Sequence, residues 1–173
     1  FIPTGNPPHK VGRRVTLASH RVNMLRLALQ GKENFDISCI EAYSDEPSYS
    51  VKTLSILRKN NPDDNYYFII GADSLVYLPD WKDYLTLITM CTFIAVMRPG
   101  FSKEICKAAY DKVTKDGATV IMGDFPEYDI SSTDIRFAFE NNLIIDNSQI
   151  SRYVDPQVYE YIKANNLEPF LAT

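Results

Sequence analysis

The order of apolar and polar positions along the chain is typical of an α/β protein. Two runs, 66–70 and 92–97, are apolar almost throughout, as expected of parallel strands that helices bury on both faces. Short strands are also predicted over 35–42 and 119–122. Residues 1–2 have the character of the end of another buried strand, so we expect a first strand upstream of them.

Helical patterns fill the stretches between these runs. A helix is predicted from about Thr16 to a glycine cap at Gly31, because apolar residues recur at i, i+4, i+7 and i+11, namely at Ala18, Val22, Leu25 and Leu29. The next helix is predicted to be capped by Ser48 or Ser50. Further helices are predicted over Lys103–Lys112 and from near Ser132 and Asp155.

Strands that alternate with helices predict a parallel sheet with helices on both faces, which is a Rossmann-like architecture. The length of 173 residues suits a single domain, 1–173. In such sheets, ligands bind beyond the carboxyl ends of the strands. The loops after Ile2, Ile70 and Met97 are therefore where functional residues are expected.

The composition excludes several kinds of partner and site. The net charge of −4 and the pI near 5.2 argue against a nucleic-acid partner, which would require a basic surface stripe. No apolar run approaches the length that spans a bilayer, so no membrane partner is expected. Three widely spaced cysteines without a CxxC pair suit a reducing cytoplasm, and two histidines do not make a histidine-rich metal site.

The first candidate loop carries the sequence Thr4-Gly5-Asn6-Pro7-Pro8-His9-Lys10 at the expected ligand edge. Lys10 offers a mobile point charge suited to phosphate, and His9 offers a hydrogen-bond donor that charges near neutral pH. Both are therefore candidate catalytic residues. The alternative is a solvated loop with ordinary cations.

The second candidate loop contains Asp73, directly after the apolar strand, and Trp81, the only tryptophan. Asp73 is placed either to bind a ligand hydroxyl at the strand's carboxyl end or merely to cap the following helix. A single tryptophan is usually a core residue. Because Trp81 lies in a loop that contains Pro79, we favour an exposed stacking surface for a flat heteroaromatic ring.

The third candidate is a helix start with three successive hydroxyls, Ser131, Ser132 and Thr133. Free N–H groups and the helix dipole make such a start an anion site, and Arg136, one turn later, could fork onto a phosphate. The alternative is a plain cap with Arg136 in solvent. The tyrosines of the C-terminal tail, Tyr153, Tyr159 and Tyr161, are expected to form the packed face of a closing helix, since nothing polar beside them suggests a site.

Short motifs run in a fixed order through nearly the whole chain. They are Phe1-Ile2-Pro3, Pro7-Pro8-His9-Lys10, His20-Arg21, Met24-Leu25, Pro47-Ser48-Tyr49-Ser50, Thr53-Leu54, Phe68-Ile69-Ile70-Gly71-Ala72-Asp73, Leu78-Pro79-Asp80-Trp81, Arg98-Pro99-Gly100 and Ile130-Ser131-Ser132-Thr133-Asp134-Ile135-Arg136. In these motifs the chain resembles the bacterial nicotinate mononucleotide adenylyltransferases.

The resemblance implies a nucleotidyltransferase fold and transfer of an adenylyl group from ATP to nicotinate mononucleotide. The products would be nicotinate adenine dinucleotide and pyrophosphate, in cytoplasmic NAD biosynthesis, with Mg²⁺ accompanying ATP. In that family a first strand runs into an H-x-G-H-type motif, so we expect the first βα unit to lie upstream of Phe1. The sequence leaves the oligomeric state open, with a homo-oligomer allowed.

The resemblance also implies roles for individual residues. Trp81 should stack on the pyridine ring and Asp73 should contact bound nucleotide, while backbone N–H groups near Ser50 and Lys82 should meet the nicotinate carboxylate. Ser50 stands where threonine is common in the family. Lys82 stands where an aromatic residue is frequent, which puts part of the ring pocket in doubt.

The expected chemistry agrees with the residue types. The nucleophile is already an ionised phosphate, so the reaction needs positioning and cations rather than a general base. Ser132, Thr133 and Arg136 at the helix start would bind ATP. Two rivals remain open: a related adenylyltransferase for nicotinamide mononucleotide or pantetheine phosphate, and a catalytically silent nucleotide-binding module.

Overall fold

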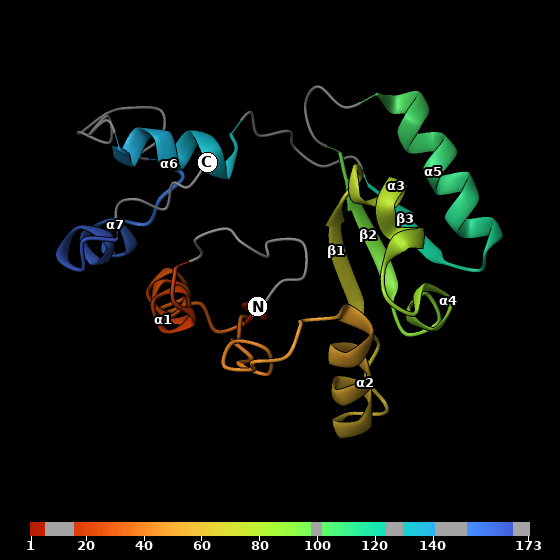
Figure 1. Cartoon of the computed structure of the whole chain (residues 1–173), viewed down its shortest axis with the longest axis horizontal. Coiled ribbons are helices and arrows are strands. Elements are labelled where there is room, and N and C mark those ends of the chain that lie inside the picture. The colour runs from red at the N-terminus through yellow and green to blue at the C-terminus, as the bar shows by residue number, and fades with distance from the viewer. Residues whose placement is uncertain (6–15, 98–101, 124–129, 141–151, 168–173) are drawn as a thin grey trace. The chain divides into compact units, whose positions relative to one another are not determined.

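A computed structural model describes residues 1–5, 16–97, 102–123, 130–140 and 152–167 (Figure 1). Contacts within the chain group it into two compact units. Unit 1 consists of Phe1–Ser48 and Ile130–Thr173, and unit 2 consists of Tyr49–Asp129. Among the described residues, no helix is both long enough and apolar enough to cross a bilayer.

Unit 2 is built on a three-stranded parallel sheet in the order β1-β2-β3. The strands are β1 (Tyr67–Gly71), β2 (Thr92–Val96) and β3 (Thr119–Met122). The register places Ile69 opposite Ile94, and Ile94 opposite Ile121. The structure therefore confirms the parallel strands predicted from the apolar runs of this unit.

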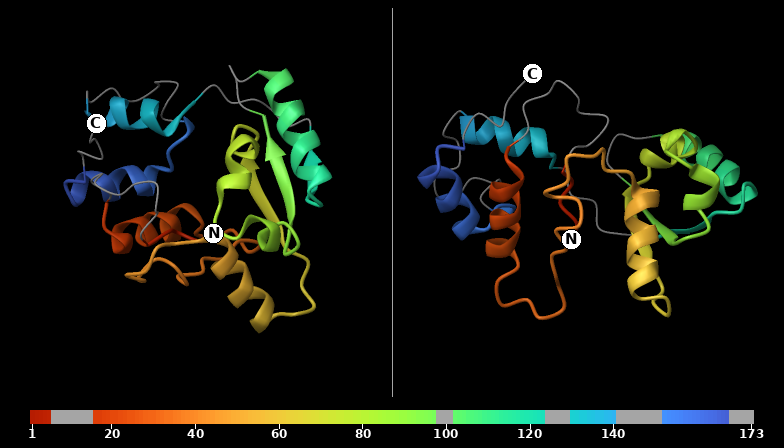
Figure 2. Two further views of the ribbon diagram at one scale, coloured as in Figure 1. Left: turned by 45° about the vertical axis from the view of Figure 1, so that its right-hand side comes forward. Right: turned by 60° about the horizontal axis from the view of Figure 1, so that its bottom comes forward.

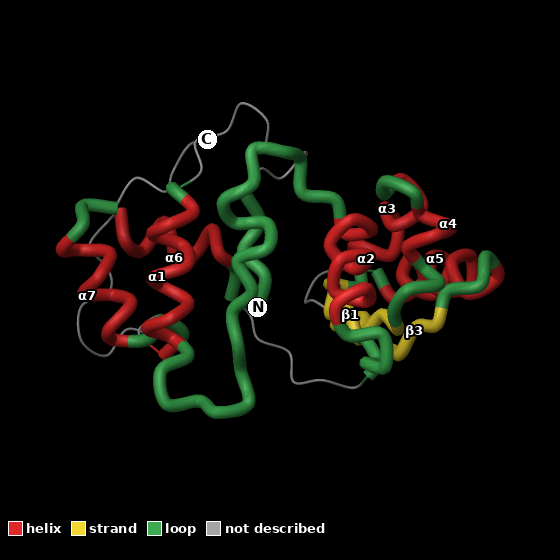
Figure 3. Tube along the Cα trace, turned by 90° about the horizontal axis from the view of Figure 1, so that it is seen from below, coloured by secondary structure: helices red, strands yellow, loops and turns green. Residues whose placement is uncertain are grey.

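The helices of unit 2 lie on one side of this sheet (Figures 2 and 3). They are α2 (Ser50–Asn60), α3 (Ser74–Tyr77), the 3₁₀ turn η2 (Leu78–Asp80), α4 (Tyr84–Leu87) and α5 (Lys103–Lys115). Ser102 caps α5 by accepting a hydrogen bond from the Ile105 N–H at 3.3 Å. Phe93 on β2 is fully buried at the centre of the resulting core, with α3 and α5 supplying Leu75 and Val113.

Alternate strand residues face away from these helices. In the described part of unit 2, Tyr67, Ile69 and Ile121 on this second face are 58%, 69% and 45% exposed. Because side chains alternate along a strand, Phe68 and Ile70 point to the helix side instead. The helices of unit 2 thus form one of the two helical layers that were predicted to cover the sheet.

Unit 1 contains three described helices: α1 (Ala18–Ala28), α6 (Ser132–Glu140) and α7 (Pro156–Ala164). Asp155 caps α7 by accepting a hydrogen bond from the Gln157 N–H at 2.9 Å, and Pro156 occupies the first helical position, where its missing N–H does no harm. A second apolar core joins the helices, with Ala138, Phe139 and Ile162 at its centre. The predicted helices of this unit are confirmed.

Two local predictions in unit 1 are wrong. Residues 35–42 form no strand, although the Phe1 amino group donates to the Asp36 carbonyl at 2.8 Å and the Ser38 N–H donates to the Phe1 carbonyl at 2.9 Å. These two bonds flank Ile37, as in a parallel strand pair, but a single step of pairing does not make a ladder. Helix α1 ends before Gly31, which lies in the following turn with φ 75°.

Candidate functional site

Asp73 stands directly beyond the carboxyl end of β1. The Ala72 N–H donates to the Val96 carbonyl at 2.8 Å, so the pairing of β1 with β2 continues up to the residue before Asp73. Asp73 occupies the N-cap position of α3, but its side chain makes no capping hydrogen bond. The capping alternative therefore does not account for this aspartate.

The carboxylate of Asp73 lies against the interior of unit 2. Its Oδ1 atom is shielded from solvent. Burial, and after it the charge of Asp73, raise the pKa of the Cys106 thiol on α5. Cys106 is 1% exposed, and burial also raises the pKa of the Cys91 thiol to about 11. Both cysteines are protonated packing residues at neutral pH.

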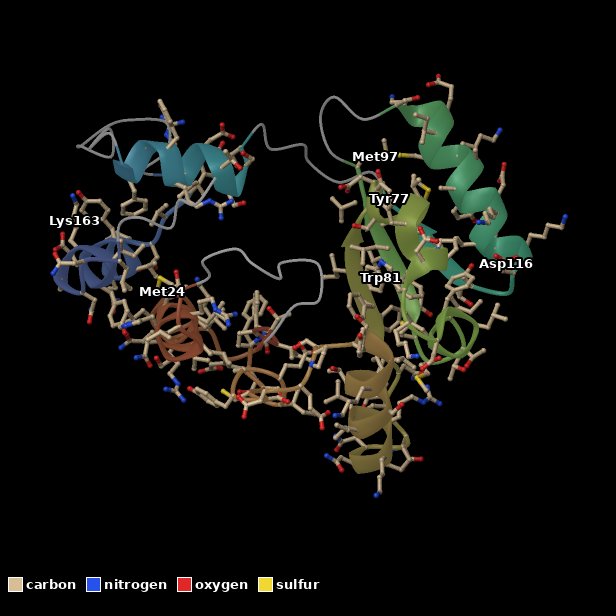
Figure 4. The ribbon with its side chains drawn as sticks, in the orientation of Figure 1. Met24, Tyr77, Trp81, Met97, Asp116 and Lys163 are labelled. Atoms are coloured by element: carbon tan, nitrogen blue, oxygen red, sulfur yellow. The ribbon has the colours of Figure 1, made fainter. Side chains whose placement is uncertain are left out.

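Trp81 follows the 3₁₀ turn η2 and is half-buried. Its ring meets that of Phe68 edge-on, with centroids 6.0 Å apart and an interplanar angle of 70°. Trp81 thus packs against the core of unit 2 through one part of its ring. Figure 4 shows Trp81 beside β1. The remaining ring surface is what a stacked ligand would have to use.

Lys82 and Ser50 are the two residues predicted to lie near the nicotinate carboxylate. The Lys82 ammonium lies 3.9 Å from Asp83 Oδ1, and both side chains are 58% exposed. Such a surface pair contributes little stability, so Lys82 can turn to another partner at small cost. Ser50 is the first residue of α2, with Tyr49 at the N-cap and no side-chain capping bond. The predicted serine cap is therefore wrong.

Ser48 instead anchors Gly5, the last described residue before His9 and Lys10. Its hydroxyl accepts a hydrogen bond from the Gly5 N–H at 3.2 Å. Gly5 also lies so close to the carbonyl of Glu41 that a Cβ atom at this position would collide with it. Glycine is required here by packing. His9 and Lys10 themselves lie outside the described residues.

The start of α6 in unit 1 combines a cap with a second group of polar residues. The Asp134 N–H donates to Ser131 Oγ at 3.1 Å, and the Ser131 N–H donates to Asp134 Oδ2 at 2.8 Å. This is a capping box, and its Ser-x-x-Asp spacing is visible in the sequence. The Ser131 hydroxyl donates to the same carboxylate at 2.5 Å, and these bonds hold the pKa of Asp134 below its ordinary value.

Ser131 and Asp134 form the cap of α6, and the cap does not use the other polar residues of its first turns. Arg136 Nη2 donates to Ser132 Oγ at 3.0 Å, so the structure brings these two predicted residues together. Thr133 is exposed in the same first turn. Arg136 as a whole is half-buried, and it lies one helical turn from the helix start. This bond gives Arg136 a defined side-chain partner on α6, and its role toward a phosphate stays a prediction.

A model of the cytidylyltransferase-like family matches residues 1–138. The chain belongs to this family. A probable nicotinate-nucleotide adenylyltransferase of Clostridium botulinum (strain Loch Maree / Type A3) is 38% identical over 169 residues, or 96% of this chain and 82% of the relative. A protein of the same name from Bacillus licheniformis is 38% identical over 168 residues, or 96% and 80%. These relatives confirm the family that the motifs predicted.

Solved structures with the same fold come from Plasmodium falciparum nicotinic acid mononucleotide adenylyltransferase. Its complex with NaAD has a TM-score of 0.73, with 20% identity, and covers 98% of this cytidylyltransferase-like chain and 82% of that one. Its complex with APC has a TM-score of 0.66, with 21% identity, and covers 88% and 76%. The likeness confirms the predicted Rossmann-like nucleotidyltransferase fold.

Proposed function

We propose that the protein is an adenylyltransferase that joins ATP and nicotinate mononucleotide into nicotinate adenine dinucleotide and releases pyrophosphate. The relatives that share 38% of its residues carry the name of this activity. Within the structure, the start of α6 supports the proposal best, because Arg136 and Ser132 meet there at 3.0 Å beside a separate cap. A helix start with an oriented guanidinium suits a phosphate group.

ATP would bind through its phosphates to this helix start. Ser132 and Thr133 belong to the first turn of α6, where backbone N–H groups have no partner within the helix. Arg136 would add a charge-assisted hydrogen bond, and His9 and Lys10 would supply further positive charge. No general base is needed, because the phosphate of the mononucleotide is ionised before it attacks the α-phosphorus of ATP. The protein's part is to position the two anions and to stabilise the charge that develops.

Nicotinate mononucleotide would bind through residues of unit 2. The free surface of Trp81 would stack on the pyridine ring, and Asp73, at the strand end, would contact the bound nucleotide. Backbone N–H groups near Ser50 and Lys82 would meet the nicotinate carboxylate. Ser50 supports this assignment because it opens α2, where N–H groups point out of the helix.

Mg²⁺ would enter with ATP as part of the substrate. Among the described residues, no three His, Cys, Asp or Glu side chains come together in a way that could hold a metal ion. Mg²⁺ commonly binds through substrate phosphates and a few waters, so such a cluster is not required. The metal would offset the charge of the pyrophosphate as it leaves, while the residues at the start of α6 hold the phosphates.

The test is Arg136→Ala in the complete gene product that contains this chain. Loss of a charge-assisted contact to ATP should lower kcat/KM for ATP roughly tenfold to over a hundredfold. Arg152→Ala serves as the matched control, because Arg152 is an exposed arginine of the same unit outside the proposed site. A folded Arg136→Ala enzyme with near-normal kcat/KM for ATP would refute the assignment.

A further inference from the structure

The hydroxyl of Tyr161 on α7 is held by two side chains of α1. It lies 2.8 Å from His20 Nδ1 and accepts a hydrogen bond from Asn23 Nδ2 at 3.0 Å. The His20 and Tyr161 rings also meet edge-on, with centroids 5.8 Å apart. The two partners, with Met24, occupy positions i, i+3 and i+4 of α1 and therefore share one face of that helix. The sequence had indicated no polar partner for this tyrosine.

The direction of the bond between Asn23 and Tyr161 follows from the donors present. Arg26 Nη1 donates to Asn23 Oδ1 at 3.2 Å, which turns the Asn23 amide nitrogen toward Tyr161. The tyrosine oxygen accepts from that nitrogen, so its single proton is available for His20 Nδ1. In the tautomer of His20 that carries its proton on Nε2, the Nδ1 atom accepts this proton. The two bonds join Tyr161 to His20 and Asn23 in a chain of four side chains that ends at Arg26, and the bonds at Tyr161 are partly buried.

A different side of α7 packs against α6. Ile162 belongs to the buried cluster with Ala138 and Phe139 of α6, and the ring of Tyr159 stacks on Phe139 with centroids 5.4 Å apart. Met24 of α1 is packed against the same cluster, and Figure 4 shows it on the α1 ribbon next to α7. Helix α7 therefore connects α1 to the helix that carries Ser132 and Arg136.

We propose that Tyr161 is a positioning residue for the ATP phosphates. Apolar packing between helices is non-directional and tolerates small rotations and slides. Two hydrogen bonds that join one hydroxyl to His20 and Asn23 of α1 fix the rotation of α7, and α6 packs against α7. The hydroxyl thereby sets where the Arg136 guanidinium points. This inference rests on the proposed role of Arg136 in ATP binding, and it gives α7 a part in that binding without any contact with substrate.

Tyr161→Phe tests the proposal, because it keeps the ring and removes only the hydroxyl. In the complete gene product, we expect KM for ATP to rise roughly two- to tenfold, with KM for nicotinate mononucleotide unchanged. Tyr43→Phe is the matched control, since Tyr43 is a tyrosine of the same unit that is 62% exposed. An unchanged KM for ATP would overturn the proposal and leave Tyr161 a purely structural role. Equal rises for both substrates would overturn it too.

Variants at His20 separate positioning from general loosening. In His20→Asn, the amide Oδ1 occupies the place of Nδ1 and can accept the Tyr161 proton, so KM for ATP should stay near the natural value. His20→Leu offers no acceptor and should behave like Tyr161→Phe. If the two His20 variants raise KM for ATP equally, the hydrogen bond does not position the site.

A double variant distinguishes failure of this inference from failure of the proposed function. If Tyr161 acts through Arg136, then Tyr161→Phe should have little further effect on KM for ATP in an Arg136→Ala background. Fully additive effects would overturn the inference. If Arg136→Ala alone leaves ATP kinetics unchanged, the proposed ATP site itself fails, whatever Tyr161→Phe does.

Discussion

The alkaline stability of unit 2 should depend on one buried tyrosine. Tyr84, the first residue of α4, is 9% exposed, and its hydroxyl donates to Asp116 Oδ2 at 3.0 Å. Burial, and after it the hydrogen bond to Asp116 and the charge of that carboxylate, raise the pKa of Tyr84 to about 12. The neutral phenol is therefore the form that the folded protein favours.

The sign of the pH dependence follows from proton binding. Below pH 10, Tyr84 is protonated in both the folded and the unfolded chain, so its contribution to stability is fully present. Between pH 10 and 12, the unfolded chain releases this proton while the folded chain keeps it, so stability falls as pH rises. A difference of two pKa units corresponds to about 2–3 kcal/mol of unfolding free energy lost across this window.

Urea denaturation at a series of pH values from 8 to 12 measures this loss. Tyr84→Phe should cost about 0.5–1.5 kcal/mol at pH 8, because a hydrogen bond is lost, and should flatten the decline above pH 10 relative to the natural protein. Asp116→Asn should keep most of the decline, since burial is the largest cause of the raised pKa. Tyr67→Phe controls for a tyrosine that is 58% exposed. An equally steep decline in Tyr84→Phe would refute the reasoning.

Two further predictions concern the mononucleotide. Adding nicotinate mononucleotide should change the fluorescence of Trp81. Trp81→Ala should raise KM for that substrate with little effect on KM for ATP. If Trp81→Ala simply unfolds, the tryptophan has a core role instead. An amide presents an NH₂ group that cannot face N–H donors, so kcat/KM should favour nicotinate over nicotinamide mononucleotide at least roughly tenfold. Lys82→Ala should reduce this preference only modestly, because the backbone donors remain, and equal values for both substrates in the natural protein would reject the nicotinate assignment.

The sequence predicted the sheet of unit 2 well and the segment 35–42 of unit 1 poorly. Runs such as 66–70 are apolar at every position and are followed by glycine, so both the strand and its end are encoded locally. Residues 35–42 mix apolar residues with Asp36, Ser38 and Glu41, so their pattern is weaker. A strand also needs partners for its backbone groups, and among the described residues the structure shows only one step of pairing in this segment, with Phe1. The composition of a segment does not reveal whether a neighbouring strand is present to pair with its backbone.

The contacts of Tyr161 could not be predicted for a related reason. His20 and Tyr161 are separated by 141 positions, and no local pattern links them. From the tail alone, the tyrosines of a closing helix predict packing. Tyr159 confirms this by stacking on Phe139, whereas Tyr153 lies before α7 and is 43% exposed. The polar partners of Tyr161 come from α1. Long-range hydrogen bonds of this kind depend on how helices dock, which short-range periodicity does not determine.

The start of α6 has residues that the cap does not use. Its sequence allowed either a cap or an anion site, and the structure shows a cap that involves only two of the polar residues. Ser131 and Asp134 form the capping box, while Ser132 and Arg136 pair with each other. The carboxylate of Asp134 would repel a phosphate, but hydrogen bonds from the Ser131 N–H and hydroxyl hold one of its oxygens. Since the cap does not use Ser132, Thr133 or Arg136, a phosphate can bind these residues without unfolding the helix that presents them.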